Sequence, residues 1–189
     1  MVGKDNLSSV ISGFEAAGNR SDIPSVRDCA DLRVRENKVY HLETISLALC
    51  VEVHFSGRPL NSLPKEVLLC ALSACRWGLH FSGSASEELQ PKLEDVLFKD
   101  RATKLAFLKD TIEPGLEVGK EHVSGLHRIT TEEQFADVLP ELAIEWLERF
   151  EQATESAVWN ILKAAVRFVD CSEVADLVEA RIKKIRVGK

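Results

Sequence analysis

Apolar residues recur at helical spacing along almost all of this 189-residue chain, and this periodicity constrains its fold more than any other feature. The alternation of apolar and polar residues that indicates a β-strand is nearly absent. Hydrophobic residues make up 45% of the chain, enough to bury a core. We therefore predict an all-α protein, a single helical domain over residues 1–189 with roughly seven or eight helices.

Helix start and stop signals divide this pattern into segments. HLETISLALCVEVHF predicts a buried helix over residues 41–55, and LPKEVLLCALSACRWGLHF predicts another over 63–81. Pro114 and Gly115 indicate a helix end, and residues 113–129, with three glycines and no apolar stripe, are expected to form an irregular loop or a short hairpin. Further helices are expected at about 7–17, after Pro24, and from Asp170 to Ile185. The stretch from Ser86 to Ile112 is expected to form one helix bent near Pro91 or two short helices, and the stretch from about Thr130 to Val169 is expected to be helical with a perturbation at Pro140.

One five-residue stretch occurs twice with a single change at its first residue, as VHFSG at 53–57 and as LHFSG at 79–83. Each copy is followed by a polar linker, a Pro-Lys pair and an apolar run, which is the order expected of stacked helical hairpins. We predict a two-copy helical-hairpin repeat in which Phe55 and Phe81 pack inward. Chance similarity is the alternative, because two copies are fewer than a solenoid normally has.

The ends and the cysteines bear on the compartment. The first ten residues lack the apolar segment of a secretory signal, and no run of 18 apolar residues could span a membrane. The five cysteines are an odd number, so we expect buried, reduced thiols rather than a disulfide framework. A soluble, cytoplasmic protein that does not bind membranes is the expectation.

Candidate chemical sites are weak. Cys50 and His54 share a helical face, but no CxxC or HxxxH pair supplies further ligands, so we expect no metal and no cofactor. His122 and His127, beside Glu121 in the irregular segment, are candidates for general acid-base catalysis, although the sequence places no nucleophile near them. A small helical enzyme using these histidines is therefore an alternative function.

The distribution of charge indicates one candidate binding surface. Residues 86–157 carry 17 acidic and 8 basic side chains, a net charge of −9, which argues against nucleic-acid binding. Projected on a single helix from 131 to 155, seven acidic side chains fall within a sector of about 120°, opposite an apolar face. Ile144 lies in the same sector and is expected to be an apolar anchor. The seven acidic residues are Glu133, Asp137, Glu141, Glu145, Glu148, Glu151 and Glu155.

These observations predict a non-enzymatic protein-binding module that engages a basic partner protein through an acidic helix face. Like charges four residues apart destabilise a helix by about 0.2–0.5 kcal/mol per pair, so an acidic row calls for an explanation. An inhibitor of a basic enzyme, of the kind that toxin-neutralising immunity proteins represent, would have such a surface. Alternatives are a solvated face without a partner, the enzyme described above, or a helical-repeat scaffold.

Overall fold

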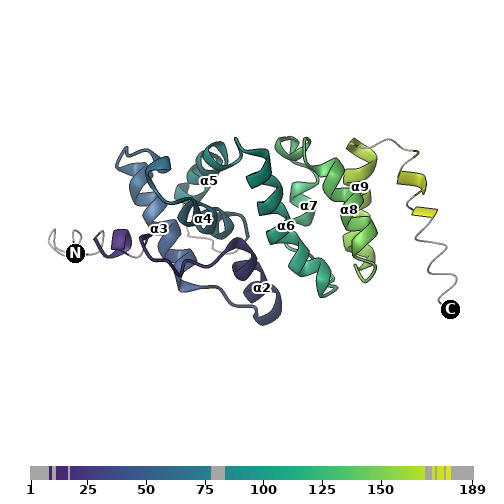
Figure 1. Ribbon diagram of the computed structural model, residues 1–189, viewed down its shortest axis with the longest axis horizontal. Coiled ribbons are helices and arrows are strands. Elements are labelled where there is room, and N and C mark those ends of the chain that lie inside the picture. Colours follow the sequence, from purple (N-terminus) through teal and green to yellow (C-terminus); the bar gives the residue numbers. More distant parts are fainter. Residues whose placement is uncertain are drawn as a thin grey trace. The chain divides into compact units, whose positions relative to one another are not determined.

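The computed structural model describes residues 9, 12–16, 18–77, 84–168, 172, 174–176 and 178–179. Every regular element in these residues is a helix (Figure 1), so the prediction of an all-α protein is confirmed. In the same part of the chain, no helix combines the length and the apolar sequence needed to cross a membrane. Of the helix expected at 7–17, residues 9 and 12–16 are described, and they are helical, whereas most of the helix expected at 170–185 lies outside the described residues.

The chain divides into two compact units, unit 1 over residues 1–111 and unit 2 over residues 112–189. The boundary falls inside helix α6 (Arg101–Glu117). A single domain over 1–189 stays a prediction, because two compact units can belong to one domain or to two.

Unit 1 is built around a central helix, α4. This helix packs against α2, α3 and α5, and its buried residues Val67, Ala71 and Leu72 are fully shielded from solvent. The predicted helix over 41–55 is confirmed as α3, and the helix predicted over 63–81 is described as far as Trp77. The elements of unit 1, besides the start of α6, are α2 (Val26–Glu36), α3 (His41–Phe55), the 3-10 turn η1 (Leu60–Ser62), α4 (Lys65–Trp77) and α5 (Ser84–Leu97).

Local sequence explains where α2 begins. Ser25 is its N-cap, and the Ser25 hydroxyl accepts a hydrogen bond from the backbone N–H of Asp28 while the Asp28 carboxylate accepts one from the backbone N–H of Ser25. This reciprocal capping box satisfies two backbone donors that a helix start leaves without an intrahelical partner.

The first copy of the repeated stretch behaves only partly as predicted. Val53 is buried, and Gly57 ends α3 with a φ of +75°, a left-handed conformation that favours glycine. Phe55, however, is 57% exposed, so the prediction that it packs inward is wrong. It follows Val53 by two residues and therefore points away from the core side of α3. The second copy at 79–83, including Phe81, lies wholly outside the described residues, and the two-copy repeat stays a prediction.

Unit 2 packs α9 against α8 and α7. The largest buried side chains of its core are Trp146 and Phe135, with Ile112 and Leu116 from the last turns of α6. Besides that part of α6, its elements are α7 (Leu126–Ile129), the 3-10 turn η2 (Glu133–Phe135), α8 (Leu139–Arg149) and α9 (Glu155–Phe168).

The loop predicted over 113–129 is mostly helical, which corrects the prediction. Helix α6 continues through Pro114 and Gly115 to Glu117, and α7 occupies the end of the segment. Buried Ile112 and Leu116 hold this part of α6 in the core, and their burial outweighs the helix-breaking preference of Pro and Gly. Only residues 118–125 are irregular.

The single helix predicted over 131–155 is also wrong, because η2, α8 and α9 occupy that stretch as separate elements. Pro140 is the second residue of α8, where a missing N–H costs no hydrogen bond, so it begins a helix rather than bending one. Phe150 ends α8 with φ and ψ of −101° and 74°, outside the helical range. The seven acidic residues therefore do not lie along one helix.

Candidate partner-binding surface

The structure distributes the predicted partner-binding residues over five segments. Glu133 lies in η2, and Asp137 lies in the turn before α8. Glu151 lies in the connection after α8, and Glu155 is the first residue of α9. Helix α8 carries the remaining four, which are Glu141, Ile144, Glu145 and Glu148. Only these four keep the mutual geometry that the helical projection predicted.

Arg149 links α8 to the end of α6 through several carboxylates. Its Nη1 lies 3.0 Å from Oε2 of Glu113 and 3.6 Å from Oε1 of Glu145, and its Nη2 lies 3.8 Å from Oε1 of Glu117. Glu113 is buried and also accepts a hydrogen bond from the Trp146 indole at 3.3 Å. One positive charge therefore faces three carboxylates, which leaves this group with a net charge of −2.

Glu133 is already paired within the chain. The guanidinium of Arg167, near the end of α9, forms an ion pair with the Glu133 carboxylate and donates to the backbone carbonyl of Thr131 at 3.3 Å. This contact ties η2 to α9. The two side chains are 42% and 74% exposed, so the pair contributes little to folding, but another protein would meet the charge of Glu133 with a cation already beside it.

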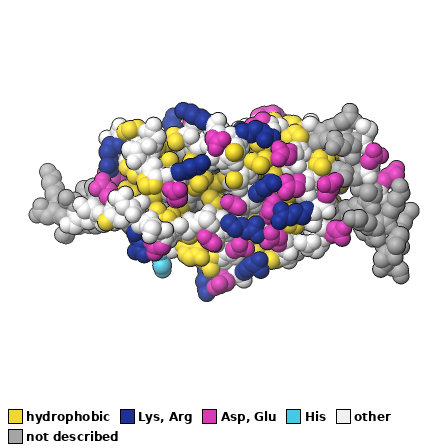
Figure 2. Space-filling model, viewed as in Figure 1, with side chains coloured by type: hydrophobic (Ala, Val, Ile, Leu, Met, Phe, Trp, Pro, Cys, Tyr) yellow, Lys and Arg dark blue, Asp and Glu magenta, His cyan; other side chains and the backbone are white. Residues whose placement is uncertain are grey.

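The exposed acidic positions of α8 are Glu141 and Glu148. They are seven residues apart and share one side of the helix with the half-buried Glu145, while the opposite side buries Leu142 and Trp146. Figure 2 shows acidic side chains interspersed with Lys and Arg over the face in view. Ile144 is half-buried, so it exposes less apolar area than the sequence analysis expected of an anchor.

Sequence reasoning missed the largest exposed apolar side chains of unit 2. Trp159 is 60% exposed and Val166 is 58% exposed, both on α9. A helical projection of residues 155–168 would have found them, since both point away from the side that buries Ile161 and Ala165.

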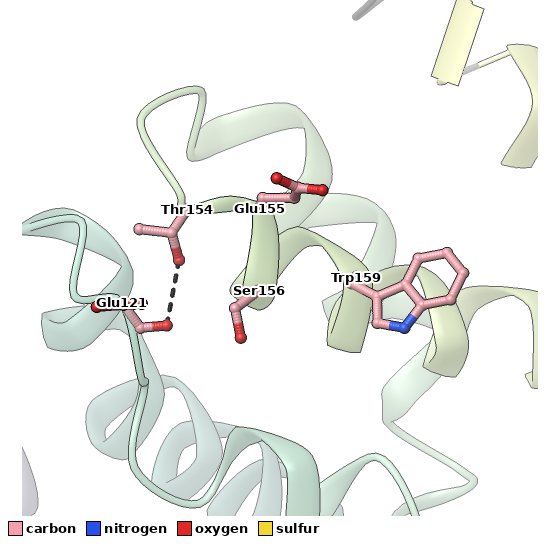
Figure 3. Close-up of a pocket in the computed structure, with 5 residues that line it drawn as sticks. All are labelled: Glu121, Thr154, Glu155, Ser156 and Trp159. Atoms are coloured by element: carbon pink, nitrogen blue, oxygen red, sulfur yellow. Dashed lines mark hydrogen bonds between the residues drawn. The ribbon is translucent and has the colours of Figure 1, made fainter.

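An open cleft of about 710 Å³ adjoins Trp159 and is lined by Glu121, Thr154, Glu155, Ser156 and Trp159. The Thr154 hydroxyl lies 3.2 Å from the carbonyl oxygen of Lys120 and 3.4 Å from that of Glu121, and it accepts from the N–H of Ala157 at 3.4 Å. Thr154 thus caps α9 and ties its start to the irregular segment. Figure 3 shows the indole projecting from α9 well away from this contact.

The histidines of the enzyme alternative are both exposed. His127 lies in α7, where its Nδ1 is 3.3 Å from the amide oxygen of Asn160. His122 lies in the irregular segment. Neither lines the cleft beside Trp159. The enzyme remains an alternative.

The described cysteines lie in unit 1, and none is in a disulfide. Burial raises the pKa of Cys50 to about 12, and burial likewise raises the pKa of Cys75 to about 12. Thiols that hold their protons so strongly are poor nucleophiles and poor metal ligands. Within the described ranges, no group of three or more His, Cys, Asp or Glu side chains is placed to hold a metal ion.

No known protein family, curated protein or solved structure matches this chain. Its function must therefore be argued from its own residues.

Proposed function

We propose that the protein is a non-enzymatic binding module that engages a basic partner protein through the acidic side of α8 and the connection after it. The observation that carries the proposal is the exposure of Glu141, Glu148 and Glu151 beside Arg149, whose charge already faces three other carboxylates. The acidic surface is smaller than the sequence predicted, because Glu133, Asp137 and Glu155 lie outside α8 and Glu133 already has Arg167 beside it.

Electrostatics favour a basic partner over a neutral one. Arg149 is 50% exposed, so water screens its contacts with Glu145 and Glu117 and they contribute little to folding. A Lys or Arg side chain of a partner could share those carboxylates without first breaking a buried contact. Solvated carboxylates on a rigid helix also accelerate association with a positively charged protein.

Rigidity of the surface supports the same proposal. Helix α8 buries Leu139, Leu142, Trp146 and Leu147, and Phe150 follows it into the core. An ordered helix loses little conformational entropy on binding, so its exposed residues present fixed positions to another protein. An inhibitor of a basic enzyme, of the immunity type, is the class of protein that would use such a surface.

A cytoplasmic location and the absence of membrane and nucleic-acid partners belong to the same proposal. Buried thiols outside any disulfide are typical of a reducing compartment. The acidic balance of residues 86–157, −9 in net charge, would repel phosphate backbones. The helical-repeat scaffold remains the alternative from another class.

Charge reversal on α8 tests the proposal. The protein would be used to capture partners from a native lysate at about 50 mM and 500 mM salt, which screen surface charge weakly and strongly. We expect a basic protein to bind at low salt, to be lost at high salt, and to be lost at low salt when Glu141→Lys and Glu148→Lys are combined.

A control variant in unit 1 separates the effect of charge at the α8 surface from the effect of the net charge of the protein. Glu66 and Glu87 are exposed residues of α4 and α5, and Glu66→Lys with Glu87→Lys changes the net charge by the same amount. This variant should retain the partner. Equal loss in both variants, or an interaction indifferent to salt, would show that the α8 surface is not the contact.

A further inference from the structure

Helix α9 has an exposed apolar side in addition to the side that it buries. Trp159 and Val166 are seven residues apart, so they lie on nearly the same side of the helix. Both are more than half exposed, whereas Ala157, Ile161 and Ala165 are buried. A large aromatic and a branched aliphatic side chain presented together are typical of a contact surface.

The charges on this exposed side are ordered. Glu155 lies four residues before Trp159, and Lys163 lies four residues after it. All three are exposed, and residues spaced by four form one ridge of a helix. The order of charges alone is what a helix dipole favours, with an acidic start and a basic end. The dipole does not explain why an indole is exposed between them.

We propose that this side of α9 binds the same side of a second copy of the chain, with the two helices antiparallel. A two-fold axis at Trp159 would bring Glu155 of each copy opposite Lys163 of the other, and the two indoles together. Arg167, one turn further, would face the connection that carries the exposed Glu151. Packing along ridges of residues spaced by four gives helix crossings of about −50°, which suits such a pair.

Contacts within the chain are compatible with this arrangement. Lys163 Nζ lies 5.5 Å from the centre of the Trp159 ring, a cation–π contact. The ammonium can retain this contact with the indole of its own chain while it pairs with a carboxylate of the second copy. The guanidinium of Arg167 has five N–H donors, and its contacts with Glu133 and Thr131 do not use all of them, so it can also donate to a second copy. The cleft of about 710 Å³ beside Trp159 (Figure 3) leaves space for a second indole.

A basic partner protein fits this side of α9 poorly. Glu155 contributes one negative charge, and Lys163 and Arg167 contribute two positive charges. A second copy supplies the complementary order by symmetry, while a parallel arrangement would place like charges together. Self-association through α9 goes beyond the proposed function. It shares Glu151 with the proposed surface and uses none of the side chains of α8.

A charge swap provides the test, with sedimentation velocity of the full chain over a dilution series as the measurement. Glu155→Lys alone and Lys163→Glu alone should each raise the dimer dissociation constant at least about tenfold, because like charges then meet twice across the axis. The two changes combined should return it to within about threefold of the original, since the opposite charges again face each other. Glu155 and Lys163 are eight residues apart on one helix, so a contact within the chain cannot produce this rescue.

Two further variants complete the design. Trp159→Ser should abolish the dimer, while Phe55→Ser, which removes a similarly exposed aromatic side chain from α3 of unit 1, should leave it unchanged. The circular dichroism of every variant should match that of the original protein. The proposal is overturned if the unmodified chain stays monomeric up to about 1 mM, if the combined swap fails to restore association, or if Phe55→Ser weakens association as much as Trp159→Ser.

The two proposals fail separately. The dimer should persist in the combined Glu141→Lys and Glu148→Lys variant, because neither residue lies on α9. If that variant loses the partner but keeps the dimer, the partner binds at α8 and not at α9. If it loses both the partner and the dimer, the two surfaces are not separate.

Discussion

The two units differ in how a buried carboxylate is paired. In unit 1, Glu43 and Glu94 pair with arginines that are largely shielded from water. In unit 2, Glu113 pairs with Arg149, which is half exposed. Arg33 donates to Glu43 at 2.9 Å and also to the Ser73 hydroxyl, joining α2, α3 and α4. Arg76 of α4 donates to Glu94 of α5 at 2.8 Å. In unit 2, Arg149 of α8 meets Glu113 from the solvent side.

This contrast separates charges that hold helices together from charges that another molecule can reach. The Arg33–Glu43 and Arg76–Glu94 pairs of unit 1 lie between helices, where removing one partner leaves a charge in the interior. The carboxylates around Arg149 extend from the interior to the surface, because Glu113 is buried while Glu145 and Glu117 are half-buried. A partner protein could compete for the second kind of contact and not for the first.

Removing Arg76 should have the largest effect. Arg76→Met leaves the buried Glu94 carboxylate with the Gln90 amide, 2.8 Å away, in place of a cation. We expect the free energy of unfolding to fall by about 3–5 kcal/mol, because the side chain of Arg76 has no solvent exposure and Glu94 has little. Urea denaturation followed by circular dichroism measures this change.

The matched variant in unit 2 is Arg149→Met. Glu113 would retain the hydrogen bond from Trp146, and water can reach the position that the guanidinium leaves, so the loss should be about 1–2 kcal/mol. Equal losses for Arg76→Met and Arg149→Met would mean that the two units do not differ in the way described.

Alkaline pH should destabilise the chain through the thiols of unit 1. The pKa of Cys50 and the pKa of Cys75 are raised by burial from 9.0 to about 12, so the folded chain binds more protons than the unfolded chain between these values. Their contribution to stability is complete below pH 9 and is lost as pH rises through 12. At pH 10 we expect a loss on the order of 1 kcal/mol for each thiol.

The control is the variant that combines Cys50→Ala with Cys75→Ala. Other groups also titrate between pH 8 and 10, and they are the same in both proteins. The decrease in unfolding free energy over this range should therefore be smaller in the double variant, by an amount that reports the two thiols. An unchanged decrease would show that these thiols do not keep their protons in the folded chain.

Of the changes considered, Gly115→Ala should have the smallest effect on stability. A Cβ at this position of α6 would lie 2.9 Å from Cγ1 and 3.3 Å from Cγ2 of Val123, closer than side chains tolerate. We expect a destabilisation of about 1 kcal/mol in thermal unfolding. In a Val123→Ala background the same change should stabilise by about 0.5–1 kcal/mol, because alanine favours the helix more than glycine does. A destabilisation that persisted in that background would rule out the contact with Val123 as its cause.

The sequence predicted the helices whose ends have chemical signals. Helix α3 was placed at 41–55 because a long apolar run ends at Gly57, and α2 was expected after Pro24, where Ser25 forms its cap. The all-α class followed from periodicity alone. These features depend on local residues, so one sequence is enough to show them.

The errors arose where tertiary packing decides. Pro114 and Gly115 indicated a helix end, but buried Ile112 and Leu116 continue α6 beyond them. No Gly or Pro follows α8, and the N-cap Thr154 of α9 is the one local mark of the interruption, so a projection along one helix places the acidic residues in a single row. The pairing of Glu133 with Arg167 joins residues 34 positions apart and could not be read from spacing.

The close approach of Gly115 to Val123 constrains how this chain can vary during evolution. The two positions share one small volume, so a larger residue at 115 requires a smaller one at 123. We expect glycine at 115 wherever 123 is β-branched, and joint replacement elsewhere. Such covariation would identify true relatives of this protein even where the rest of the sequence has diverged.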